Sequence, residues 1–337
     1  MKACQITGIR QIDVVDLPEP TPGTGCVVVR VESVSLCGTD LHQYDGTLPI
    51  TYPRIPGHDC SGVVHAVGAS VTNVAVGDRV TIKPSFPCRA CSDCANYHYA
   101  DCLSKRLIGL WSDGCLAEYI EVPATNVIVL PASVSFDAAA NLEPFTVAIN
   151  TFRKLNLDMG SWVAILGQGP IGLGQTSVAT LGGHRVIAID TRSEALDLAR
   201  KRGAEVTLDP TEVDVVEHIL ELTGNGVDAV IETAAVPATV AMETALVRKY
   251  GKLANIGISS GVGSLDIATI VARGLTVYGI GGNGGKGQYE NALALLASGR
   301  IDPESLVTHR FPLDQAAAAF DLAFTKREPV IKVVLHR

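Results

Sequence analysis

The sequence predicts an α/β protein with a β-rich first part and a doubly wound parallel sheet in its second part. Two observations support this. From about Ser161 onward, short apolar runs rich in β-branched residues alternate with stretches of helical spacing, which is typical of parallel strands joined by helices. Before that point, β-branched runs are separated by Gly and Pro, as in a compact barrel-like β domain. The 337 residues, 47% of them hydrophobic, suffice for two domains with separate cores.

The expected elements follow this division. In the first part, strands are expected over residues 26–31, 62–67, 79–83 and 118–122. In the second part, they are expected over residues 161–166, 185–190, 205–208, 227–232, 252–256 and 275–280. The helices between them are expected over residues 171–181, 193–202, 213–222, 239–247 and 267–272, and Ser193 is the expected N-cap of the second. The tail should add helices over residues 289–297 and 315–324 and a strand over residues 330–335. We therefore expect a first domain over residues 1–150, a second over 151–287, and a C-terminal return to the first over 288–337.

Composition and charge exclude several classes of function. The formal net charge is −8 and the Lys and Arg residues are scattered, so a nucleic-acid partner is not expected. No uninterrupted apolar stretch reaches the length of about 18 residues that a membrane span needs, and the N-terminus lacks the pattern of a signal peptide. We expect a cytoplasmic protein whose nine cysteines are thiols or metal ligands rather than disulfides.

A glycine-rich turn marks the expected cofactor site. The motif G-Q-G-P-I-G at residues 167–172 follows an apolar strand and opens a helix, which is the context of a dinucleotide-binding turn. Gly167 permits the tight turn, Gly169 lets the backbone approach a pyrophosphate, and Gly172 lets helix and strand pack closely. Pro170 and Ile171 belong to the first turn of the helix, whose unpaired N–H groups and partial positive charge face the phosphates.

Asp190 is expected to select the cofactor. It ends the second strand of this domain, where a carboxylate accepts hydrogen bonds from both ribose hydroxyls of NAD and repels the extra phosphate of NADP. Arg192 lies two residues further on, and its guanidinium could instead bind that phosphate. NAD is therefore the expected cofactor and NADP the alternative. Thr233 and Ile256, at the ends of two further strands, complete the candidate cofactor-binding residues.

Four closely spaced cysteines indicate a structural metal site. Cys88, Cys91, Cys94 and Cys102 follow the pattern C-x2-C-x2-C-x7-C. Two-residue gaps let neighbouring thiolates converge on one tetrahedral ion, and four sulfurs close its shell. Zinc bound there would have no open position and is expected to be structural. Free buried thiols or a redox pair are the alternatives.

A second group offers a mixed set of ligands. Cys37 opens the motif C-G-T-D-L-H, the triplet G-H-D follows at residues 57–59, and Glu143 precedes the second domain. Together Cys37, His58, Asp59 and Glu143 supply one thiolate, one imidazole and two carboxylates. That mix suits a zinc ion with an open position, although each residue taken singly is more often structural.

The chain resembles the zinc-containing medium-chain alcohol dehydrogenases, and within them the polyol branch of sorbitol, L-threonine and sugar-acid dehydrogenases. The motifs that carry the resemblance are spread over nearly the whole chain: C-G-T-D-L-H at 37–42, G-H-D at 57–59, the four cysteines, E-P-F-T-V at 143–147, G-Q-G-P-I-G at 167–172 and V-T-H-R-F-P-L at 307–313. The resemblance implies a GroES-like β-barrel catalytic domain built from both chain ends, with a Rossmann domain between them. It also implies a homo-oligomer, either a tetramer or a dimer, in which the apolar strand over residues 275–280 would pair with its copy.

The resemblance further implies roles for the mixed set. Cys37 and His58 would bind a catalytic zinc, and either Glu143 or Asp59 would be the third ligand. Polyol-type members carry Glu after the His, whereas this chain has the shorter Asp59, so we expect Glu143 to lie nearer the metal in the substrate-free state. Liver-type enzymes carry a cysteine near the position of Glu143. This chain lacks that cysteine, which favours the polyol branch.

The expected reaction is hydride transfer between a small secondary alcohol, polyol or sugar acid and NAD. Zinc is a Lewis acid that favours loss of the alcohol proton, and Thr39 Oγ1 would pass that proton, through the ribose and His42, to solvent. The alternative roles of these two are an ordinary turn hydroxyl and a surface residue. Tyr44 and Trp111 are candidate pocket walls or core residues. Asn283 and Lys286 stand in the stretch where the branch often carries a substrate-binding Arg.

Two other kinds of protein compete with this interpretation. A zinc-free reductase of the same superfamily would not need Cys37, His58 or the four cysteines. A non-catalytic NAD-binding relative would have lost its ligands, and function must be argued from the site. The intact ligand sets favour the enzyme and predict two zinc ions per chain, one catalytic and one structural.

Overall fold

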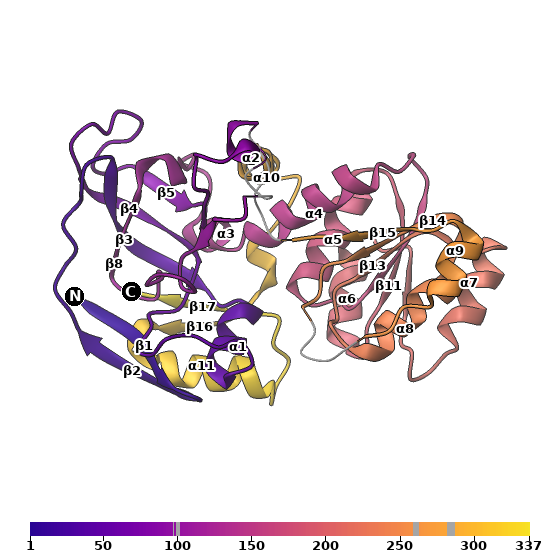
Figure 1. Cartoon of the computed structure of the whole chain (residues 1–337). Coiled ribbons are helices and arrows are strands. Elements are labelled where there is room, and N and C mark those ends of the chain that lie inside the picture. The colour runs from indigo at the N-terminus through magenta and orange to yellow at the C-terminus, as the bar shows by residue number, and fades with distance from the viewer. Residues whose placement is uncertain (97, 99–101, 259–262, 282–286) are drawn as a thin grey trace. The chain divides into compact units, whose positions relative to one another are not determined.

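The computed structural model describes residues 1–96, 98, 102–258, 263–281 and 287–337, and it divides into two compact units (Figure 1). Unit 1 contains Met1–Glu143 and Asn283–Arg337, and unit 2 contains Pro144–Gly282. Both ends of the chain therefore belong to unit 1. The domain boundaries expected at residues 150 and 287 stay a prediction. Among the helices of the described residues, none has the length and apolar character that crossing a membrane requires.

A seven-stranded sheet forms the centre of unit 1. Its order is β16-β17-β3-β4-β5-β9, and β8 also pairs with β3. The strands are β3 (Cys26–Ser35), β4 (Asp59–Val67), β5 (Arg79–Ile82), β8 (Tyr119–Pro123), β9 (Val127–Val129), β16 (Val307–Pro312) and β17 (Lys332–His336). Because β3 runs antiparallel to both β4 and β17, those two strands begin at the edge of the sheet where β3 ends. That edge carries the first candidate metal site.

Shorter elements complete unit 1. Strand β1 (Lys2–Gly8) pairs with β2 (Gln11–Asp16), and β6 (Ser85–Phe86) pairs with β7 (Arg106–Leu107). The helices are α1 (Gly38–Asp45), α2 (Ser92–Ala95), α3 (Phe136–Ala140), α10 (Gln288–Ala297) and α11 (Ala316–Thr325), with 3-10 turns η2 (Ala124–Asn126), η3 (Glu304–Leu306) and η4 (Leu313–Gln315). The apolar residues of the sheet, of β1 and of α11 share one hydrophobic core.

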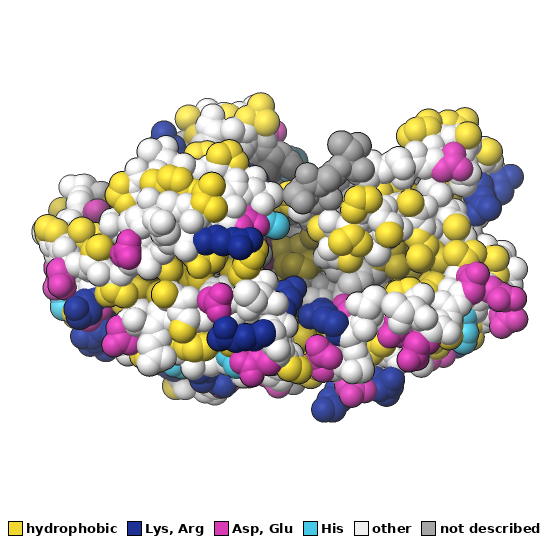
Figure 2. All heavy atoms as spheres, turned by 90° about the horizontal axis from the view of Figure 1, so that it is seen from below, with side chains coloured by type: hydrophobic (Ala, Val, Ile, Leu, Met, Phe, Trp, Pro, Cys, Tyr) yellow, Lys and Arg dark blue, Asp and Glu magenta, His cyan; other side chains and the backbone are white. Residues whose placement is uncertain are grey.

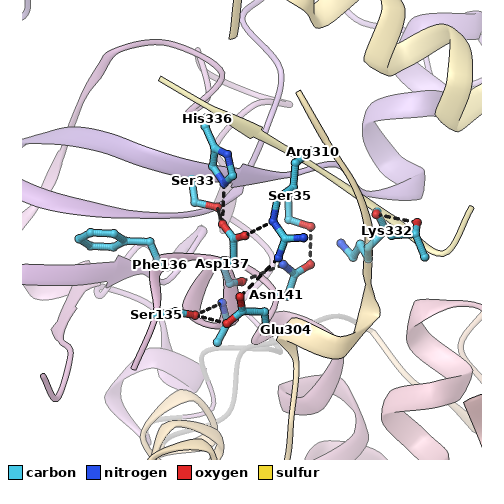
Figure 3. Close-up of polar contacts among 12 residues, drawn as sticks. Ser33, Ser35, Ser135, Phe136, Asp137, Asn141, Glu304, Arg310, Lys332 and His336 are labelled. Atoms are coloured by element: carbon cyan, nitrogen blue, oxygen red, sulfur yellow. Dashed lines mark hydrogen bonds and ion pairs between the residues drawn. The ribbon is translucent and has the colours of Figure 1, made fainter. Parts of the chain in front are cut away.

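A polar network joins α3 to strands from both ends of the chain (Figure 3). The carboxylate of Asp137 accepts hydrogen bonds from Ser33 Oγ (2.8 Å) and Arg310 Nε (2.7 Å), and it lies 2.7 Å from His336 Nε2. Ser33 belongs to β3, Arg310 to β16 and His336 to β17. Burial would raise the pKa of Asp137, but these partners together lower it.

Unit 2 is a six-stranded parallel sheet with the order β12-β11-β10-β13-β14-β15. The strands are β10 (Trp162–Leu166), β11 (Arg185–Ile189), β12 (Val206–Leu208), β13 (Val227–Glu232), β14 (Val247–Asn255) and β15 (Thr276–Gly279). The helices are α4 (Glu143–Leu155), which begins on the last residue of unit 1, α5 (Pro170–Leu181), α6 (Ser193–Lys201), α7 (Val215–Thr223), α8 (Pro237–Leu246) and α9 (Ile267–Arg273). The predicted doubly wound sheet is confirmed, and its strand order reverses between β10 and β13, where such sheets bind ligands.

One local expectation was wrong. Ser193 is the first residue of α6 and not its N-cap, which is Arg192. The carboxylate of Asp190 accepts the N–H of Arg192 (2.9 Å), so the turn that follows β11 closes one residue earlier than the sequence pattern suggested.

Charged side chains of both signs are intermingled over the described residues of the face shown in Figure 2. A basic field of the kind that attracts nucleic acid is not seen on that part of the surface.

Candidate metal and cofactor sites

Cys37, His58 and Asp59 lie together at the edge of the sheet in unit 1. Their possible ligand atoms are all within 4.8 Å of one another. Cys37 is the N-cap of α1, two residues after β3 ends, and Asp59 is the first residue of β4. His58 and Asp59 are only 4% and 3% exposed, so charges among these residues are weakly screened by water.

Asp40 organises this cluster, although the sequence interpretation did not single it out. It is fully buried and accepts hydrogen bonds from the N–H groups of Cys37 and Gly57, both at 2.9 Å. Its Oδ1 lies 3.5 Å from His58 Nδ1. A carboxylate beside one ring nitrogen fixes the imidazole so that the other nitrogen can bind a metal. Its place at the third position of α1, typical of an acidic capping residue, was the signal available in the sequence.

The charges of the cluster favour a cation. Burial alone would lower the pKa of His58, but Asp59, Asp40 and Cys37 raise it well above its ordinary value. Burial raises the pKa of Asp59, although His58 and Lys332 oppose that effect. Neither carboxylate oxygen of Asp59 has a hydrogen-bond partner, and a buried polar group without one is unfavourable, so both oxygens are available to bind a cation. Because thiolate, imidazole and carboxylate are all zinc ligands, the residues present fit a zinc ion.

Glu143 is not a member of this three-residue group. Burial, and then the charges of Asp59 and Glu143, raise the pKa of Tyr289 on α10 well above its ordinary value. The structure therefore groups Asp59 with Cys37 and His58, and it lends no support to the expectation that Glu143 is the nearer carboxylate.

Thr39 and His42, the expected proton-relay residues, both lie on α1 and are half-buried. Thr39 Oγ1 is 3.9 Å from Cys37 Sγ, which places the hydroxyl beside the cluster. His42 follows three residues later, one turn along the helix. The relay itself stays a prediction.

Of the candidate pocket residues, Tyr44 belongs to the core. It is 8% exposed, and its ring centroid lies 5.2 Å from that of Phe320. Trp111 is 56% exposed and so remains accessible to a ligand. Asn283 and Lys286 lie outside the described residues.

The four cysteines of the other predicted site also converge. Cys88, Cys91, Cys94 and Cys102 have sulfur atoms within 4.8 Å of one another, and the short strands β6 and β7 flank the segment that carries them. Backbone N–H groups of Ala90 and Cys91 lower the pKa of Cys88 to about 6, whereas burial raises that of Cys94 to about 12. All four are free thiols, and four sulfurs at this spacing fit a closed tetrahedral zinc site.

The glycine motif forms the turn between β10 and α5. Gly167 has φ +89°, and a side chain on Gly172 would overlap the carbonyl oxygen of Gly167. At Gly169, the N-cap of α5, an added Cβ would meet no atom within 4 Å. That open space, in front of the first turn with Pro170 and Ile171, is what the close approach of a pyrophosphate requires.

Two further candidates lie at neighbouring strand ends. Thr233 Oγ1 donates to the carbonyls of Leu166 (3.0 Å) and Gly167 (2.9 Å), so it braces the turn from the β13 side. The N–H of Ile256, just after β14, donates to the carbonyl of Glu232 (3.0 Å). Both residues thus lie along the carboxyl ends of the strands, where the cofactor is expected.

Asp190 lies at the end of β11 beside this turn. It accepts hydrogen bonds from the N–H of Gln168 (2.6 Å) and from Arg192 Nε (3.0 Å) and Nη2 (3.1 Å). Burial would raise its pKa, but Arg192 and Gln168 together lower it. The carboxylate is therefore charged near neutral pH, which favours hydrogen bonds from ribose hydroxyls.

The chain is similar to known proteins over most of its length. Residues 23–132 match the family model of the alcohol dehydrogenase GroES-like domain, and residues 170–298 match that of zinc-binding dehydrogenases. The chain is 34% identical to sorbitol dehydrogenase of Bacillus subtilis (strain 168) over 344 residues, which cover 100% of this chain and 97% of the relative. It is also 34% identical to L-threonine 3-dehydrogenase of Bacillus velezensis over 314 residues, covering 91% and 90% of the two chains. Among solved structures, a protein from Sinorhizobium meliloti 1021 described as a zinc-binding dehydrogenase bound to NADP has a TM-score of 0.92 at 32% identity, covering 100% of this chain and 99% of that chain.

Proposed function

The chain belongs to the zinc-containing medium-chain alcohol and polyol dehydrogenase family, and from that membership we propose that it transfers hydride between a secondary alcohol and NAD. The family makes it a zinc-dependent oxidoreductase. Its preference for NAD, the roles of its residues and its assembly are our proposal. The observation that carries it is the group of half-buried Cys37 with buried His58 and Asp59, held on one side by Asp40.

We assign the catalytic zinc to Cys37, His58 and Asp59. Zinc bound there supplies Lewis-acid stabilisation of the charge that develops on the substrate oxygen. If Glu143 also bound tightly, the four ligands would close the tetrahedron and leave no position for substrate. We therefore propose that Glu143 acts from outside the ligand set, where it adjusts the charge of the site.

Paired substitutions test this assignment. Asp59→Ala should lose the catalytic zinc and the activity while the four-cysteine site keeps its ion. Glu143→Ala should keep both zinc ions and lose turnover. Metal content and kcat are measured on the same preparations, with Asp59→Asn and Glu143→Gln as size-matched controls. The opposite pattern would make Glu143 the ligand, and unchanged rates in both would contradict a polyol-type site.

Thr39 and His42 are proposed to move the proton. The hydroxyl of Thr39 lies beside the cluster, and His42 lies one turn further along α1. Thr39→Val should lower kcat by about 100-fold or more, within the range of general acid–base catalysis, whereas Thr39→Ser should retain most of it. Equal rates in the two variants would remove Thr39 from the mechanism.

The NAD preference rests on the carboxylate of Asp190, which is fixed by the N–H of Gln168. The kcat/KM values for the two cofactors should favour NAD, and Asp190→Ser should narrow the difference. A preference for NADP by tenfold, equivalent to about 1.4 kcal/mol, would instead make Arg192 the residue that binds the 2′-phosphate. The NADP-bound relative makes this comparison necessary.

An NAD-coupled screen of sugar alcohols, aldonates and simple secondary alcohols tests the reaction itself. Turnover of one class, abolished by Cys37→Ser, is the expected result. A zinc-loaded protein that binds NADH and oxidises no member of the panel would favour a non-catalytic relative.

We also propose a homo-oligomer, a tetramer by family resemblance, that pairs through β15. This edge strand and the adjacent α9 expose apolar side chains: Ile267 is 65% exposed, Val271 76% and Val277 40%. An unpaired apolar edge favours pairing with a second copy. Sedimentation that shows a monomer at micromolar concentration would contradict this.

The nine free cysteines suit a reducing compartment, and we propose that the enzyme works in the cytoplasm.

A further inference from the structure

We propose that Lys332 is a positioning residue of the catalytic metal site, whose buried ammonium group holds one oxygen of Asp59 so that the metal receives only the other. This inference rests on the proposed function, in which Asp59 is a zinc ligand. It concerns a residue that lies in none of the sequence motifs described above.

The sheet brings Lys332 to the site. Lys332 is the first residue of β17 and Asp59 the first residue of β4, and these strands flank β3 on opposite sides. Ser35 at the end of β3 pairs with Asp59, and the N–H of Leu36 donates to the carbonyl of Val333 (2.9 Å). Lys332 and Asp59 therefore lie on either side of the short segment that leads from β3 to Cys37.

The position of the ammonium group is set by the backbone. Lys332 Nζ donates to the carbonyl of Leu36 (3.0 Å) and lies 3.7 Å from Asp59 Oδ2. The main chain of Lys332 is fixed as well, because its carbonyl accepts a hydrogen bond from Thr308 Oγ1 (3.1 Å). The side chain of Lys332 is 4% exposed, so the ammonium cannot exchange Leu36 and Asp59 for bulk water.

A buried lysine without a counter-charge is strongly unfavourable. The carbonyl of Leu36 satisfies one N–H but carries no charge, so the ion-pair partner that the structure shows for Lys332 is Asp59. The attraction between the two draws Oδ2 toward Lys332 and leaves Oδ1 for the metal. Asp59 is thereby kept as a ligand through one oxygen, which preserves the open position that substrate needs.

Loss of the charge at residue 332 should therefore strengthen metal binding and weaken catalysis. Lys332→Gln keeps a donor for the carbonyl of Leu36 and removes the charge, whereas Lys332→Arg keeps the charge. Lys2→Gln is a matched control, because Lys2 Nζ also lies 3.7 Å from a carboxylate, that of Asp16, but in an exposed pair. All proteins are prepared in excess zinc, since the ion can offset the charge of Asp59 when the ammonium is absent.

Three measurements follow on these proteins: release of the catalytic zinc to a chelator, the visible absorption of the cobalt-substituted site, and kcat with KM. In Lys332→Gln we expect zinc release slower by about tenfold, a size typical of changes around metal ligands. We also expect weaker cobalt bands, as ligand number increases, and a reduced kcat. Lys332→Arg and Lys2→Gln should behave as the unmodified protein does.

Each other outcome overturns the inference. Unchanged or faster zinc release in Lys332→Gln would show that Lys332 does not compete with the metal for Asp59. Failure of Lys332→Gln and Lys332→Met to fold in excess zinc would show that the ion cannot replace the ammonium. If the unmodified protein binds no zinc at Cys37, the proposed function itself fails, and that result is distinct from all of these.

Discussion

Removal of the Asp137 carboxylate should destabilise unit 1 by about 2–4 kcal/mol. Ser33 is fully buried, so Asp137→Ala leaves its hydroxyl without an acceptor, at a cost of about 1–3 kcal/mol. Arg310 and His336 have side chains that are 45% and 36% exposed. Water can replace Asp137 beside them, and each pair contributes at most about 1 kcal/mol.

Urea unfolding in excess zinc measures this loss, followed by the fluorescence of Trp111 in unit 1 and Trp162 in unit 2. Asp321→Ala is the matched control, because Asp321 forms an ion pair of the same length, 2.7 Å, with Arg327 where both side chains are about half exposed. That control should lose no more than about 1 kcal/mol. If Asp137→Ala loses no more stability than Asp321→Ala, the reasoning from burial is refuted.

The same carboxylate predicts a pH dependence. Its partners lower the pKa of Asp137 in the folded protein despite its burial, so its contribution to stability is complete above the ordinary carboxyl pKa of about 4. The contribution is lost as the pH falls below that value and through the folded pKa. Asp137→Asn should remove this component, so the stability difference between the two proteins should shrink in acid. A difference that stays constant from pH 6 to pH 3 would contradict the assignment.

Three further predictions concern the metal and cofactor sites and the exposed edge. Metal analysis should find about two zinc ions per chain. Cys91→Ser should lower the melting temperature while the protein that remains folded keeps most of its turnover, since a closed four-sulfur site is structural. Gly172→Ala should destabilise unit 2, because the added Cβ would overlap the carbonyl oxygen of Gly167. An added Cβ at Gly169 would meet no atom within 4 Å, so Gly169→Ala should fold normally but bind NADH more weakly, as measured by calorimetry. Val277→Lys on β15 should shift the sedimentation coefficient toward that of a monomer, because a charge on an edge strand opposes pairing; Val14→Lys on β2 is the control for an exposed valine.

Two of the sites that the sequence predicted depend on closely spaced residues, which fix the geometry locally. The G-x-G-x-x-G turn and the four cysteines are of this kind, because the spacing alone determines which atoms converge. The strands of unit 2 were predicted for a related reason, since strands buried on both faces form continuous apolar runs.

Two of the strands that the sequence did not predict, β2 and β16, carry weak local patterns. All side chains of β2 and β16 are exposed or half-buried, so neither strand shows the apolar run that marks a buried strand. Their pairing is determined by β1 and β17, which lie elsewhere in the chain. Tyr44 is a similar case, because the aromatic partner that makes it a core residue, Phe320, belongs to a helix near the other end of the chain.

The surroundings of the catalytic ligands were hidden from the sequence for the same physical reason. Lys332 meets Leu36 across 296 positions of sequence, and no local spacing can encode that contact. Asp40 and Lys332 nevertheless have one property in common: each is anchored by backbone groups adjacent to a proposed ligand. Asp40 accepts the N–H groups of Cys37 and Gly57, and Lys332 donates to the carbonyl of Leu36. The groups around the proposed metal site are therefore anchored to the backbone that carries its candidate ligands, an arrangement that favours a ligand geometry formed before an ion binds.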